Sequence, residues 1–167
     1  MMNGGNMKTI KRRRKENKTD YLKRIKLLKS KIPRIVFRKT NRYLVSQYVV
    51  SEAAQDVIKF GINSKHLLKY GWPEKINLNS LPAAYFLGFL LGKKIIKEKV
   101  EIPIIDFGLQ RVLKGSKMHA FIKGLVDSEL KIKYNEKFFP SQERIKGEHL
   151  EGKIPFEEIK LKIEKEK

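Results

Sequence analysis

The pattern of apolar and polar residues predicts strands in the first part of the chain and mainly helices in the rest. Runs rich in β-branched and aromatic residues predict three consecutive strands, over residues 34–39, 43–50 and 57–62. Thr40 and Asn41 are turn residues, so the first two strands should form a hairpin with a basic tip. Because consecutive strands joined by short links usually pair, we expect a three-stranded antiparallel arrangement.

Apolar residues spaced three and four apart predict helices elsewhere. The expected helices span residues 21–30, 64–70, 80–99, 118–126 and 154–167, with a further turn within residues 141–149. Thr19 is the expected N-cap of the first helix, and Asp20 places a negative charge in its first turn. The helix from Asn79 or Ser80 is apolar over more than half of its circumference and should be buried, with Gly88 and Gly92 allowing it to pack closely on the sheet.

Two shorter runs complete the predicted sheet. Residues 102–107 are expected to form a buried strand in a parallel arrangement, and residues 130–134 a last edge strand. Strands and helices in this order predict an α/β fold, a mixed sheet covered by helices. We expect a basic extension over residues 1–30, a globular domain over 31–150 and a charged helix over 151–167 that docks on the body or on a neighbour. Residues 1–18 carry almost no apolar side chains and should be disordered until a partner binds.

Positive charge is concentrated at the start of the chain. Residues 1–42 contain sixteen Lys or Arg against only Glu16 and Asp20, in a chain of net charge +20. Its densest run is Lys11, Arg12, Arg13, Arg14 and Lys15. An unpaired charge is too costly to bury, so this run must lie in solvent or on an anionic partner. Phosphates of nucleic acid are the favoured partner, and a solvated tail or a nuclear address is the alternative.

A second basic segment surrounds the predicted N-terminus of the helix over residues 118–126. Arg111, Lys114 and Lys117 flank Gly115 and Ser116, where free amides would favour an anion. The glycine spacing of a nucleotide-binding P-loop is missing, so an RNA backbone is a better fit than ATP.

Four aromatic residues near basic regions, Tyr21, Tyr43, Tyr70 and Trp72, are candidates for stacking on exposed bases. Trp72 lies between Gly71 and Pro73 in a turn-rich segment and is the best candidate, whereas Tyr21 is equally well explained as a packing residue.

Catalytic and metal-binding patterns are weak. The chain has no cysteine, and its three histidines show no metal-ligand spacing, so no metal site or cofactor is expected. Asp106 ends a predicted strand and would serve a metal-dependent nuclease only with further carboxylates, for which Asp56 and Asp127 are the candidates. The favoured interpretation is that Asp106 accepts hydrogen bonds from the loop at Gly108. The longest apolar run is too short to span a bilayer, so a cytosolic protein without a membrane partner is expected.

Several ordered motifs resemble one known family. They are Lys-Thr-Asp-Tyr from Lys18, Pro-Arg-Ile-Val-Phe-Arg-Lys-Thr-Asn from Pro33, Tyr-Gly-Trp from Tyr70, Leu-Pro-Ala-Ala-Tyr from Leu81, Leu-Leu-Gly-Lys-Lys from Leu90, the segment 106–116, Phe-Pro from Phe139 and Glu-Arg-Ile-Lys-Gly-Glu-His from Glu143. Together they closely resemble the universal large-subunit ribosomal protein L-eighteen family, whose eukaryotic counterpart is called L-five. The resemblance covers about residues 11–150 and is similar to the archaeal and eukaryotic form; residues 1–7 and 154–167 match no motif of the family.

This resemblance implies a structural protein of the cytoplasmic ribosome, without enzymatic activity or a small-molecule substrate. It implies binding to 5S rRNA in the central protuberance and contact with 23S-type rRNA and neighbouring ribosomal proteins. It also implies a three-layer, RNase-H-like mixed sheet without the metal-binding carboxylates. A metal-dependent nuclease and a free regulatory RNA-binding protein are the alternatives. With Trp72 added, the candidate RNA-binding residues are Lys11, Arg12, Arg13, Arg14, Lys15, Lys18, Asp20, Tyr21, Arg24, Arg34, Arg38, Lys39, Thr40, Asn41, Arg42, Trp72, Arg111, Lys114, Gly115, Ser116 and Lys117.

Overall fold

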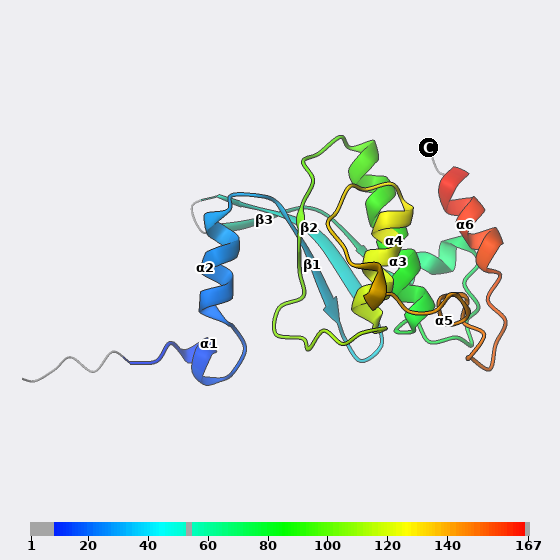
Figure 1. The fold of residues 1–167 in the computed structure, drawn as a ribbon, viewed down its shortest axis with the longest axis horizontal. Helices are drawn as coiled ribbons and strands as arrows, with labels where there is room; N and C mark the ends of the chain where they lie inside the picture. The colour runs from blue at the N-terminus through cyan, green and yellow to red at the C-terminus, as the bar shows by residue number, and fades with distance from the viewer. Residues whose placement is uncertain (1–8, 53–54, 166–167) are drawn as a thin grey trace, which may run out of the picture.

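A four-stranded mixed sheet in the order β3-β2-β1-β4 forms the centre of the molecule (Figure 1). The structure, a computed structural model, describes residues 9–52 and 55–165. The strands are β1 (Arg34–Lys39), β2 (Leu44–Glu52), β3 (Gln55–Asn63) and β4 (Ile104–Asp106). The first three pair antiparallel and β4 pairs parallel to β1, which confirms both expected arrangements.

Two details of the predicted sheet are wrong. The polar residues 51–56 were expected to be a link, but Ser51 pairs with Asp56 inside the β2–β3 ladder. These side chains stay in the ladder because the Ser51 hydroxyl donates to the Asp56 carboxylate at 2.7 Å. Residues 130–134 form no strand, because the chain turns at Glu129 (φ 74°) and the Leu130 amide bonds back to the carbonyl of Leu125.

The two longest helices pack on each other and on one face of the sheet. Helix α3 (Leu81–Lys97) is capped by the Ser80 hydroxyl, and α4 is Lys117–Asp127. A Cβ on Gly88 would meet the Phe121 carbonyl of α4, and one on Gly124 would meet the Tyr85 carbonyl of α3. Gly88 therefore permits close contact between helices, and the prediction that it faces the sheet was wrong.

The hydrophobic core lies between the sheet and these helices. Ile35, Phe37 and Tyr48 point from the sheet into the core, where Phe37 packs against Phe121 with ring centroids 4.5 Å apart. The remaining elements are the 3-10 helices η1 (Ser64–Tyr70) and η2 (Glu136–Phe138) and the helices α5 (Gln142–Lys146) and α6 (Phe156–Lys165). Helix α6 docks on the body, as expected, and buries Ile159 and Ile163. Over the described part of the chain, no helix has the length and apolarity needed to cross a membrane.

The N-terminal helices lie beside the sheet, on the side away from α5 and α6 (Figure 1). Helix α1 (Arg12–Lys15) is a single turn and α2 is Tyr21–Lys29, and neither buries a residue. Asp20, not Thr19, caps α2, because its carboxylate accepts bonds from the amides of Leu22 and Lys23. The first part of the segment expected to order on a partner, residues 1–8, lies outside the described residues.

Candidate RNA-binding surface

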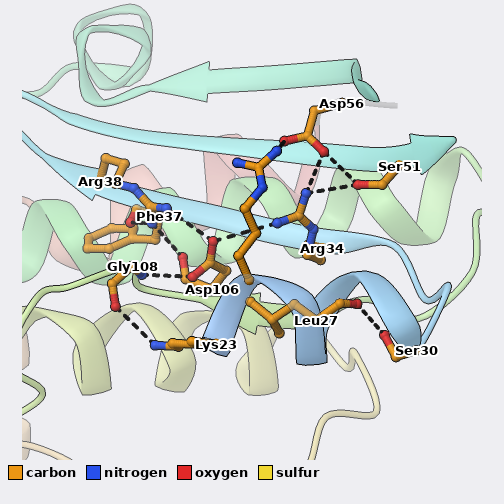
Figure 2. Close-up of polar contacts among 11 residues, drawn as sticks. Lys23, Leu27, Ser30, Arg34, Phe37, Arg38, Ser51, Asp56, Asp106 and Gly108 are labelled. Carbon is orange, nitrogen blue, oxygen red and sulfur yellow. Dashed lines mark hydrogen bonds and ion pairs between the residues drawn. The ribbon is translucent and has the colours of Figure 1, made fainter. Parts of the chain in front are cut away.

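The second face of the sheet is polar and charged. Side chains alternate along β1, so Arg34 and Arg38 point away from the core that receives Ile35 and Phe37. Figure 2 shows both arginines on this face together with Asp56 and Asp106, next to Lys23 and Leu27 of α2. The structure therefore has apolar helix packing on one face and charged side chains on the other.

Arg34 is buried between two carboxylates. Its Nη2 donates to Asp56 Oδ1 at 2.7 Å and to the Ser51 hydroxyl at 2.8 Å, and its Nη1 lies 3.9 Å from Asp106 Oδ2. Only 4% of the residue is exposed. The prediction that Arg34 contacts RNA is therefore corrected: its guanidinium is used inside the protein to join β1, β3 and β4.

Asp106 is held by the loop that follows it and by arginine. Its Oδ1 accepts from the Gly108 amide at 2.8 Å, which confirms the favoured interpretation, and its Oδ2 accepts from Arg38 Nη2 at 3.1 Å. Burial alone would raise the pKa of Asp106, but the Gly108 amide and Arg38 outweigh it and lower that pKa. Asp56 is bridged to Asp106 by Arg34, and the described residues contain no group of three or more His, Cys, Asp or Glu placed to hold a metal.

Arg38 is fixed in place while part of its side chain faces solvent. Its Nη1 donates to the carbonyls of Phe37 and Asp106, both at 2.8 Å, and its side chain is 40% exposed. Gly108 (φ +64°) makes this possible, because a Cβ there would lie 3.0 Å from the guanidinium carbon. A guanidinium that is fixed in place and partly exposed loses little freedom when it binds an anion, a property useful for binding phosphate.

A hollow that we call the basic cleft separates the N-terminal segment, residues 9–30, from the charged face of the sheet. It has a volume of about 460 Å³. The cationic side chains that line it are Arg13, Lys18, Lys23, Arg24, Arg34 and Arg38. Lys23 Nζ donates to the Gly108 carbonyl at 3.0 Å, and Arg24 Nη2 lies 3.5 Å from Asp56 Oδ2. The cleft thus brings Lys18, Asp20 and Arg24 of one predicted motif together with Arg38 of another. Lys23 lies between Asp20 and Arg24 but was not itself named as a candidate residue.

The hairpin tip is joined to the start of α4 through Asn79. Asn79 Nδ2 donates to the carbonyls of Thr40 (2.8 Å) and Asn41 (3.2 Å). Lys117 Nζ donates to the carbonyl and the side-chain oxygen of Asn79. Burial, helped by nearby Lys39, lowers the pKa of Lys117. From the sequence, Asn79 was considered only as a possible helix cap. The one sequence signal for its role was a polar side chain just before a helix, which does not indicate its contacts with the hairpin tip and Lys117.

The loop before α4 presents Arg111 and Lys114 to solvent. Its predicted phosphate-binding amides are partly occupied, however, because the Gly115 amide donates to the Phe138 carbonyl at 2.9 Å. Gly115 has φ +66°, so the glycine serves a left-handed turn. The prediction of an open anion site at Gly115 is therefore corrected, and the exposed cations of the loop remain candidates. Lys39 and Arg42 are likewise exposed near the hairpin tip.

Trp72 is not available for stacking on a base. It is 3% exposed, its Nε1 donates to the Ile76 carbonyl at 3.0 Å, and its ring meets Phe86 edge-on. The left-handed turn at Gly71 (φ 93°) ends η1 and directs the indole into the core, which explains why the turn-rich context was misleading. Tyr21 remains partly exposed, with Lys11 Nζ 4.7 Å from its ring centroid.

The arginines of α1 differ in what they contact. Arg13 Nε donates to the Thr19 hydroxyl at 2.9 Å and its side chain lines the basic cleft. Arg12 is 3.8 Å from Glu16 with an 84% exposed side chain, and Arg14 and Lys15 are also exposed. The sequence offered no means of distinguishing these four neighbours.

Comparison with known proteins identifies the family. Residues 6–102 match the family described as ribosomal large subunit proteins 60S L5, and 50S L18. The chain belongs to this family. Proteins named large ribosomal subunit protein uL18 are similar to it over most of their lengths. The protein from Korarchaeum cryptofilum is 40% identical over 150 residues (90% of this chain and 76% of that protein), and the one from Methanococcoides burtonii is 40% identical over 170 residues (98% and 97%).

A third uL18 protein, from Caldivirga maquilingensis, is 38% identical over 151 residues, or 90% of this chain and 72% of that protein. These uL18 relatives confirm the resemblance seen in the motifs from Lys18 to His149, and their sources agree with its archaeal character.

Proposed function

We propose that this member of the uL18 family is a structural component of the large ribosomal subunit that binds 5S rRNA. In this role it helps to anchor 5S rRNA in the central protuberance, contacts 23S-type rRNA and neighbouring ribosomal proteins, and works on the ribosome in the cytoplasm. Family membership supports the ribosomal part of the proposal. The observation that carries the RNA-binding part is the basic cleft, which is lined by the fixed Arg38 and five other cationic side chains.

The proposed RNA-binding surface has three parts. The first is the N-terminal segment with α2, the second is the hairpin tip, and the third is the loop before α4. Arg34 and Trp72 are left out because both are buried. The exposed residues that we propose as contacts are Lys11, Arg12, Arg13, Arg14, Lys15, Lys18, Lys39, Arg42, Arg111 and Lys114, with Arg24 and Arg38 partly exposed.

The sheet acts in this proposal as a scaffold of the RNase-H-like type, without chemistry of its own. The order β3-β2-β1-β4, with β4 parallel to β1, supports that assignment. The environment of Asp106 argues against the nuclease alternative, because arginines occupy the positions where further carboxylates would have to lie.

The test compares two RNAs at one salt concentration. The purified full chain is titrated with 5S rRNA from a uL18-containing archaeon and with an unrelated structured RNA of the same length. We expect 5S rRNA to bind at least about a hundredfold more tightly, since fixed contacts add shape recognition to the general attraction of charge. Equal affinities would contradict the proposal. Association of the tagged chain with large subunits in cells distinguishes it from a free regulatory protein.

A further inference from the structure

The basic cleft contains more positive charge than its own carboxylates balance. Asp20 and Asp106 line it, and Glu16 and Asp56 pair with lining cations from outside. Six cations against these four carboxylates leave two positive charges uncompensated. Like charges gathered in a partly enclosed space repel each other more strongly than on an open surface, so an anion in the cleft would be bound favourably.

The two walls of the cleft differ in rigidity. The sheet wall is fixed, because Arg38 makes hydrogen bonds to Phe37 and Asp106, and Gly108 is bonded to the Asp106 carboxylate. The opposite wall is the N-terminal segment. Helix α2 buries no residue, and its polar contacts with the sheet side are the Lys23–Gly108 bond and the long Arg24–Asp56 pair. Little apolar packing therefore holds this wall against the repulsion across the cleft.

We propose that the basic cleft binds one phosphodiester of RNA, and that this phosphate fastens the N-terminal segment to the sheet. The inference rests on the proposed function and adds to it a defined subsite. Arg13 and Lys23 bind the phosphate from the N-terminal side and Arg38 from the sheet side. At about 460 Å³ the cleft is larger than a phosphate alone requires, so part of the adjoining nucleotide enters with it.

Two matched pairs of variants test the subsite. Arg13 and Arg14 are neighbours in α1, and Lys23 and Lys26 are neighbours in α2; all four are exposed, but only Arg13 and Lys23 line the cleft. Arg13→Ala and Lys23→Ala should each weaken 5S rRNA binding about tenfold through loss of a charge-assisted hydrogen bond. Arg14→Ala and Lys26→Ala should weaken it by no more than about threefold, as for a general charge contact. Equal losses within each pair would overturn the inference.

A small probe separates the phosphodiester from other anions. The full chain is titrated with a dinucleoside monophosphate, which has a single phosphodiester, and in parallel with inorganic phosphate, while backbone amides are followed by NMR. We expect the dinucleotide to shift the amides of Gly108 and of α2 in a saturable way and to bind several times more tightly than phosphate. Its binding should be weaker in Arg13→Ala and in Lys23→Ala, and unchanged in Lys26→Ala, because Lys26 lies outside the cleft. Preference for inorganic phosphate, or shifts spread evenly over all basic segments, would overturn the subsite.

Failure of the subsite and failure of the proposed function give different results. If wild type prefers 5S rRNA and all four variants keep its affinity, the subsite is wrong and the proposed function stands. If wild type binds 5S rRNA and the length-matched RNA equally well, the proposed function is wrong whatever the dinucleotide shows.

Discussion

At the residue scale, Arg34 lies between the carboxylates of Asp56 and Asp106 and is the centre of the charged face. It is the only one of these three residues whose side chain the sequence assigned to RNA. The Asp106–Gly108 bond could be predicted because it is local, an aspartate accepting from an amide two residues later. The partners of Arg34 could not be predicted, because Ser51 and Asp56 are 17 and 22 residues away in the sequence and come close to Arg34 only through strand pairing.

Replacing Asp106 with Asn tests this charged cluster. Asn keeps an acceptor for the Gly108 amide but removes the negative charge beside Arg34 and Arg38, so the free energy of unfolding should fall by about 2–4 kcal/mol. Glu16→Gln is the control. The ion pairs of Glu16 with Arg12 and Lys18 are exposed, so loss of the Glu16 charge should change the free energy of unfolding by less than about 1 kcal/mol. Urea denaturation measures both, and equal effects would show that the cluster has no special role.

Acid should weaken the fold through the same carboxylates. Burial raises the pKa of Asp56, but its hydrogen bond from Ser51 and the nearby Arg34 and Arg24 outweigh burial, so the pKa of Asp56, like that of Asp106, lies below its usual value of 3.8. A carboxyl with a lowered folded-state pKa contributes stability above the unfolded value, and that stability is lost as pH falls through the folded value.

The expected result is a decrease in the free energy of unfolding from about pH 5 to pH 2. The decrease should be smaller in Asp106→Asn, because one of the two groups no longer titrates. Urea denaturation at constant ionic strength measures it. The same pH dependence in both proteins would exclude Asp106 as a source of acid sensitivity.

At the element scale, the sequence predicted the apolar faces of the elements more accurately than it predicted the elements that those faces contact. The periodicity of α3 correctly indicated a buried helix, and its glycines indicated a close neighbour. That neighbour is α4, a helix later in the chain, because helical spacing defines a face but does not name its partner. Strand β1 was predicted to the residue because a proline precedes it and turn residues follow it.

Terminal deletions test the predicted division into three parts. Removing residues 1–18 should leave cooperative thermal unfolding intact, because α1 buries no residue, while weakening 5S rRNA binding strongly through loss of Arg13 and Lys18 from the cleft. Removing residues 151–167 should lower the melting temperature, because Ile159 and Ile163 leave the core, an effect comparable to large core truncations of about 2–5 kcal/mol each. Calorimetry of both truncated chains measures the difference.

If removing residues 1–18 lowered the melting temperature more than removing residues 151–167, the N-terminal segment, and not α6, would belong to the folded body. Unchanged RNA binding without residues 1–18 would place the main contacts on the hairpin tip and the loop before α4.

At the scale of the whole molecule, the charge distribution and the family could be predicted from the sequence, but the cleft could not. Fourteen of the twenty net positive charges lie in residues 1–42. Of the described residues in this range, those of α1 and α2 lie on the side of the sheet away from α5 and α6 (Figure 1), and residues 34–39 form β1. The cleft depends on how α2 lies relative to the sheet, and that placement leaves no periodic signal in the sequence.

The salt dependence of binding separates charge from shape. If roughly six to ten basic side chains meet phosphates, raising salt from about 50 to 200 mM should weaken 5S rRNA binding on the order of a thousandfold or more. The length-matched RNA should show a similar slope of log affinity against log salt, because phosphate contacts carry no sequence information. Arg13→Ala should lower the slope by about one unit on 5S rRNA. A flat response would exclude phosphates as the main contacts. Parallel lines separated by a constant affinity ratio would instead show that charge sets the slope, while contacts that recognise shape, such as the one we propose for the fixed Arg38, set the preference for 5S rRNA.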